Sequence, residues 1–142
     1  AVRYGDMDEV ILALRDALAA RPADEPVLDV ERNANLALSN DYADRRDLRL
    51  LQARLAAAYP SVSAYSRGTV QFGWEREIIA AVAERLGVDP MVAPRPEIIA
   101  GAVMSAVRIA TRQWTASHGR ADYMTLIERA VFAVPSIADL AH

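Results

Sequence analysis

Apolar residues recur every three or four positions along most of this chain, and prolines and glycines interrupt the pattern at intervals. This spacing puts the apolar side chains on one face of an α-helix, whereas a half-buried strand would show strict alternation. No segment alternates between hairpin signals as strands do. The pattern therefore predicts an all-α fold in a single domain, residues 1–142. The six predicted helices span approximately residues 6–20, 26–38, 44–59, 60–86, 97–117 and 121–134.

The prolines and glycines also predict where individual helices end. The 60–86 helix should be continuous and end at Gly87 in a left-handed cap, and Pro135 should end the last helix. In the 44–59 helix, the predicted buried stripe consists of Leu48, Leu51, Leu55 and Ala58. The residues of that helix predicted to face water are Arg45, Arg46, Asp47 and Arg49.

The composition excludes several classes of protein. Without cysteine, neither disulfides nor thiolate metal sites can form. No apolar run approaches the roughly 18 residues that a membrane helix needs, and residues 1–6 lack the order of a signal peptide. The net charge of −3 argues against a free-standing nucleic-acid module, which usually carries a basic surface. We expect a cytoplasmic protein with no membrane partner and no cofactor.

All 16 basic residues are arginines, because the chain contains no lysine. The planar guanidinium group suits recognition of phosphate and carboxylate groups. Codon bias in a GC-rich genome would also produce a chain rich in alanine and arginine. We favour codon bias as the explanation.

The sequence contains no recognisable catalytic constellation. Its only histidines are His118, beside a glycine that ends a helix, and His142 at the C-terminus. No metal-binding HExxH pattern, no nucleophile with its base and no glycine-rich phosphate loop is present. We therefore predict that the chain is not an enzyme.

The last two predicted helices carry more apolar surface than a simple surface helix needs. Small and apolar side chains surround much of the 97–117 helix, and the 121–134 helix adds a second apolar stripe. Such a pair suits the four-helix interface of a two-fold homodimer. A hairpin buried within one subunit would show the same pattern, so periodicity alone leaves both alternatives open.

Three stretches, Tyr4–Leu14, Asp44–Leu51 and Arg95–Trp114, carry a resemblance to a known family. They resemble three helices in the C-terminal domain of TetR/AcrR-family transcriptional regulators. In chain order, these are the helix after the DNA-binding headpiece, the arginine-bearing helix before the pocket and the first dimerisation helix. Among the family's branches, actinobacterial regulators of the mycofactocin type are the most similar. The N-terminal helix-turn-helix, about 50 residues in this family, is absent, so we expect a fragment of a longer regulator.

The resemblance implies a homodimer in which the last two helices of each subunit form a four-helix interface. It also implies a pocket inside each subunit for a small apolar or amphipathic effector. Effector binding would favour a headpiece spacing that releases operator DNA, which only the missing N-terminal domain would contact. The alternative function is a helical protein–protein interaction domain without a small-molecule ligand.

Candidate site residues follow from helical spacing combined with this resemblance. A pocket needs apolar walls and a few polar groups, and Gly73 in mid-helix indicates close approach of another helix or a ligand. The candidate ligand-binding residues are Leu51, Leu55, Tyr59, Thr69, Phe72, Arg76, Ile79, Met104 and Arg108. The candidate dimer-interface residues are Ile98, Ala102, Ser105, Ile109, Trp114, Tyr123, Ile127, Val131 and Val134. The alternative is that the apolar residues simply pack the core and that the arginines lie in solvent or in ion pairs.

Overall fold

The computed structural model describes residues 5–27, 29–30, 32–34, 44–65, 68 and 71–140. Within these residues every regular element is a helix, and no strand occurs. The helices are α1 (Gly5–Ala19), α3 (Arg46–Ala58), α4 (Pro60–Tyr65), α5 (Phe72–Leu86), α6 (Arg95–Ala116) and α7 (Tyr123–Leu140). Residues 27, 29–30 and 32–34 are helical as well. The all-α prediction is confirmed.

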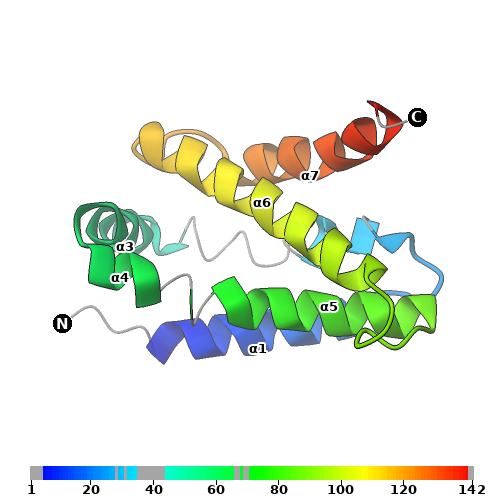
Figure 1. Ribbon diagram of the computed structural model, residues 1–142. Coiled ribbons are helices and arrows are strands. Elements are labelled where there is room, and N and C mark those ends of the chain that lie inside the picture. The colour runs from blue at the N-terminus through cyan, green and yellow to red at the C-terminus, as the bar shows by residue number, and fades with distance from the viewer. Residues whose placement is uncertain are drawn as a thin grey trace.

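Helices α1 and α5 lie side by side and run in the same direction (Figure 1). Helix α6 crosses them, and α7 packs against α6. The parallel alignment has a constant register, since Arg15 pairs with Glu77 and Arg85 donates to the carbonyl oxygen of Pro22. Helices α3 and α4 lie together beside the C-terminal end of α6 (Figure 1). The turn between α6 and α7 therefore faces α3.

The core lies where α6 packs on α5 and α7 and where α1 packs on α5. Each fully buried large apolar side chain contributes about 1.5–3 kcal/mol relative to an exposed one. At one end of the core, the rings of Trp114 and Tyr123 pack edge to face with centroids 5.9 Å apart. The core residues with the lowest exposure include Leu14, Ile78, Val82, Ala100, Val103, Ala110, Ile127 and Val131.

Two glycines behave as their positions in the sequence predict. Gly87 has a φ of +64° and ends α5 in the left-handed region, where a glycine has no steric penalty. A Cβ on Gly73 would lie 2.8 Å from Cδ1 of Ile11 on α1. The mid-helix glycine thus marks the close approach of a helix, one of the two alternatives that the sequence left open.

The predicted continuous helix over residues 60–86 is two helices, α4 and α5. Gly68 and Gln71, between them, have the wider π-helical winding. A glycine weakens an α-helix by about 1 kcal/mol relative to alanine, and π-helical turns occur as local insertions in α-helices. Gly68 thus offers a physical reason for the change in helical winding between α4 and α5.

The prediction that Pro135 ends the last helix is wrong, because α7 continues to Leu140. Proline removes one backbone hydrogen bond and crowds the preceding turn, which disfavours a helix without forbidding it.

The predicted orientation of α3 is also wrong in part. Arg49 is buried, together with its neighbours Leu50 and Gln52, whereas Leu51 is exposed. The Arg49 guanidinium donates from Nη1 to Oε1 of Gln52 over 2.9 Å. A long arginine can be buried when its charged head finds hydrogen-bond acceptors, and helical spacing alone does not reveal this.

Candidate functional site

The outer face of α6 carries an exposed stripe of apolar and small residues, which we call the α6 stripe: Ile98, Ala102, Ser105 and Ile109. Spacings of three and four residues place them on one side of the helix. Ile98 is 66% exposed and Ile109 is 41% exposed, while Ala102 and Ser105 are half-buried. Exposed apolar patches mark interaction surfaces when they are contiguous. Helix α6 therefore has one face in the core and a second apolar face that no described residue fully covers.

The other predicted dimer-interface residues lie elsewhere. Trp114, Tyr123, Ile127 and Val131 are buried in the subunit's own core, so they support α6 and α7 from inside and have almost no surface for a partner. Val134 is half-buried. The structure thus does not bring the nine residues onto one surface.

One face of α7 is partly covered from within the chain. The Arg32 guanidinium lies over the Phe132 ring at 5.3 Å from its centroid, and Arg32 Nη2 pairs with Glu128 Oε1 at 2.8 Å. These contacts attach the helical residues 32–34 to α7.

The predicted ligand-binding residues are spread over several surfaces. Met104 is buried, and Leu55 and Ile79 are half-buried. The exposed members are Leu51, Tyr59, Phe72, Arg76 and Arg108. Thr69 lies outside the described residues. No pocket among the described residues gathers this set, so the choice of these residues stays a prediction.

Two further buried polar side chains were not among the candidate site residues. Gln52 on α3 is 8% exposed and Trp74 on α5 is 9% exposed. Within the part of the chain that is described, neither Gln52 Nε2 nor Trp74 Nε1 has a hydrogen-bond acceptor. A buried donor without an acceptor costs about 1–3 kcal/mol, so both are candidates for contact with a bound molecule.

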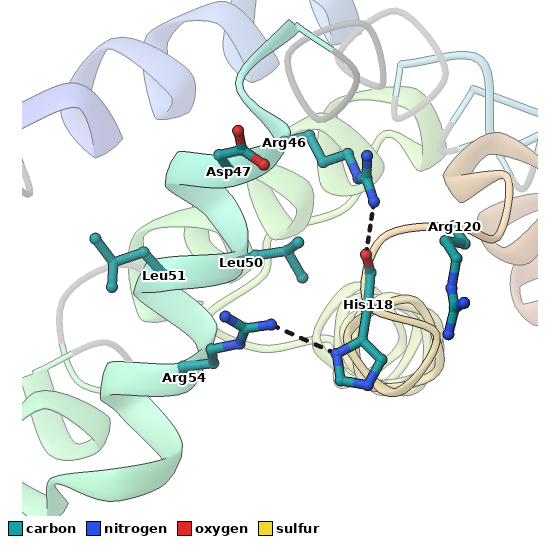
Figure 2. A pocket seen from close by; sticks show the side chains of 7 residues that line it. All are labelled: Arg46, Asp47, Leu50, Leu51, Arg54, His118 and Arg120. Carbon is teal, nitrogen blue, oxygen red and sulfur yellow. Dashed lines mark hydrogen bonds between the residues drawn. The ribbon is translucent and has the colours of Figure 1, made fainter.

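A pocket of 650 Å³, which we call the arginine pocket, opens between α3 and the turn after α6 (Figure 2). Arg46 Nη2 donates to the backbone oxygen of His118 over 2.9 Å, and Arg54 Nη2 lies 3.4 Å from His118 Nδ1. With His118 neutral, the lining residues carry a formal charge of +2. They are Arg46, Asp47, Leu50, Leu51, Arg54, His118 and Arg120.

The turn beside this pocket has an unusual backbone. His118 and Gly119 are both left-handed, with φ of +55° and +71°. Ser117 holds the turn, since its hydroxyl donates to the Trp114 oxygen over 2.7 Å and accepts from the Ala121 N–H over 3.0 Å. A Cβ on Gly119 would lie 2.7 Å from Arg46 Nε, so α3 packs closely on the turn.

Only the α3 side of the arginine pocket could be predicted from the sequence. Arg46, Leu50 and Arg54 are spaced by four residues, which places them on one face of α3. Nothing local connects them with His118 and Arg120, more than 60 residues later in the chain. That proximity follows from tertiary packing alone.

Ion pairs form outside the arginine pocket. The pKa of Glu77 is lowered, mainly by hydrogen bonds from Arg15. Partial burial of Glu77 opposes the shift, and the positive charge of Arg15 adds to it. The hydrogen bond from Arg21 lowers the pKa of Glu25, which also accepts from Asn33. Arg15 and Glu77 both line a second pocket, of 590 Å³, between α1 and α5.

The described residues also bear on metal binding and membrane insertion. They contain no group of three or more histidine, aspartate or glutamate side chains placed to hold a metal ion. None of the described helices combines the length and apolar character needed to cross a membrane.

Comparison with known proteins identifies the family. The family model described as the MftR C-terminal domain, a TetR-type C-terminal domain, matches residues 25–136. A search of curated proteins finds no match to the chain. Domains of this family are regulatory and, in general terms, dimerise and bind effectors. The resemblance seen in the sequence is confirmed: the chain belongs to the MftR C-terminal domain family of TetR-type transcriptional regulators.

Proposed function

We propose that residues 1–142 form one effector-binding and homodimerisation domain of a TetR-type transcriptional repressor that acts in the cytoplasm. The observation that carries this proposal is the α6 stripe, an apolar surface left open in a chain of a dimerising family. Operator DNA would be bound by the N-terminal headpiece of the full-length regulator, and not by this chain, whose net charge is −3.

In the proposed dimer, the α6 stripe of one subunit packs against the same stripe of its partner about a two-fold axis. Ile98 and Ile109 would supply the apolar contacts, because they are the large exposed side chains of the stripe. Ala102 and Ser105 are small, which would let the two helices approach closely. The buried side chains of α7 would hold α6 in place from behind.

The proposed effector occupies the interior of each subunit beside α3, α5 and α6. Leu55, Ile79 and Met104 are at least half-buried and would provide apolar walls. The Gln52 and Trp74 donors would each hydrogen-bond an acceptor on the effector. An apolar molecule with one or two oxygen atoms has this chemistry. Such a ligand would control DNA binding by its higher affinity for the released state.

The two tryptophans of the chain offer a direct test, because Trp74 and Trp114 give only two indole N–H signals in a nitrogen-15 NMR spectrum. The probe is 1-octanol, an apolar chain with one oxygen acceptor. We expect the Trp74 signal to shift saturably while the Trp114 signal stays nearly unchanged, and Trp114→Phe identifies the signals. If Trp74 does not respond, or only Trp114 responds, the interior effector site is wrong and an interaction domain without a ligand is favoured.

A further inference from the structure

Three arginines from two distant parts of the chain line the arginine pocket. Arg46 and Arg54 come from α3, and Arg120 follows the turn after α6 (Figure 2). Their side chains are exposed, so this pocket lies at the surface and is separate from the proposed interior effector site.

The arginine pocket lacks matching negative charge. Among the described residues, none of its three guanidinium groups forms an ion pair, and Asp47 is the only acidic side chain in its lining. By contrast, Arg15, Arg21 and Arg32 each pair with a glutamate. Cations that line the same pocket repel one another unless an anion compensates them.

The three guanidinium groups are held in place by contacts that leave other donors available. Arg46 donates to the His118 oxygen, Arg54 contacts the His118 ring, and Arg120 Nε donates to the Ser117 oxygen over 3.0 Å. Each guanidinium has five N–H donors in a planar fork, so several remain for a ligand. The turn that supplies these acceptors is itself fixed by the Ser117 hydrogen bonds.

We propose that the arginine pocket binds a phosphate group, either as free inorganic phosphate or as part of a small phosphate monoester. A phosphate carries about −1.5 to −2 charges at pH 7, which matches the formal charge of +2, whereas a carboxylate carries only one. Arginine forks bind phosphate oxygens in pairs, through charge-assisted hydrogen bonds. The pocket volume of 650 Å³ leaves room for an organic group beside the phosphate.

Calorimetric titration of the 142-residue protein with inorganic phosphate at low ionic strength tests this assignment. The variant is Arg54→Gln with Arg120→Gln, since both side chains are exposed and Arg46 is left to hold the turn. We expect phosphate to bind the double variant about a hundredfold more weakly, at about tenfold for each charged donor removed. Added sodium chloride should weaken binding to the wild-type protein through screening.

The matched control is Arg95→Gln with Arg129→Gln, two exposed arginines outside the pocket, which lowers the net charge equally. The control should keep phosphate affinity within about twofold, because distant charges are screened. Equal loss in both double variants would show a general charge effect and overturn the proposal. So would failure of the wild-type protein to bind phosphate at millimolar concentrations. Circular dichroism confirms that both variants are folded.

Two further ligands define the chemistry of the site. Acetate should bind at least about tenfold more weakly than phosphate, since it carries half the charge, and equal binding of acetate would contradict the assignment. Phenyl phosphate distinguishes the source of the phosphate group. Tighter binding of phenyl phosphate than of inorganic phosphate would assign a phosphate monoester, and the reverse order would assign the free ion.

Discussion

Two left-handed glycines, Gly87 and Gly119, follow helices α5 and α6 but have different surroundings. A Cβ on Gly87 would meet nothing within 4 Å, whereas one on Gly119 would lie 2.7 Å from Arg46 Nε and 3.1 Å from Trp114 Cζ2. The backbone therefore favours a glycine at both positions, and packing favours it further at Gly119 alone.

This contrast predicts the cost of adding a methyl group at each glycine. Gly87→Ala should destabilise the fold by about 1 kcal/mol, the cost of a left-handed alanine. Gly119→Ala should cost about 2–3 kcal/mol, since Arg46 and Trp114 must also move. Urea unfolding followed by circular dichroism measures both values. Equal losses would mean that α3 does not pack on the turn after α6.

At the residue scale, backbone requirements could be predicted from the sequence and burial could not. The cap at Gly87 and the close approach at Gly73 follow from the rarity of glycine in helices. The burial of Arg49 and Gln52 depends on which segments cover α3, and nothing in the helical spacing states that. Because arginines are usually exposed, the sequence predicted that Arg49 faces water, whereas it is buried.

At the scale of elements, the parallel pair of α1 and α5 is joined by an ion pair. Arg15 donates to both carboxylate oxygens of Glu77, over 2.9 Å and 2.6 Å. The pKa of Glu77 consequently lies below the ordinary value of 4.5. A carboxylate with a lowered pKa stabilises the fold above its unfolded pKa, and the contribution is lost as the pH falls through the folded pKa.

Glu77→Gln should therefore lower the thermal midpoint at neutral pH, and its difference from the wild-type protein should shrink as the pH falls below 4.5. We expect a decrease of about 1–4 °C at neutral pH, because solvent screens a pair with an exposed arginine. Glu84→Gln is the control, an exposed carboxylate on the same helix without an ion pair among the described residues. A difference that persists unchanged in acid would contradict the role of the ion pair.

Helix positions could be predicted more closely than helix ends and interruptions. Periodicity placed both ends of α1, α3 and α6 within two residues. It missed the division into α4 and α5 and the continuation of α7 through Pro135. A single glycine or proline shifts helix stability by a few kcal/mol, and tertiary packing is large enough to reverse either preference.

At the scale of the molecule, the fold class and the family could be predicted from patterns spread along the whole chain. The division of α6 between core and surface could not, because both of its faces are apolar. Ile98 and Trp114 look alike as interface candidates in the sequence, yet Ile98 is exposed and Trp114 is buried. Only the packing of α5 and α7 on α6 distinguishes the two faces.

Sedimentation velocity of the intact chain tests the dimer most directly. The wild-type protein should have twice the chain mass of 15.5 kDa, and Ile98→Glu combined with Ile109→Glu should have the single-chain mass, because buried charges in a two-fold interface repel. Met91→Glu is the control, since Met91 is 90% exposed and lies off the α6 stripe, and it should remain a dimer. A monomeric wild-type protein, or a double variant that still dimerises, would contradict a dimer formed through the α6 stripe.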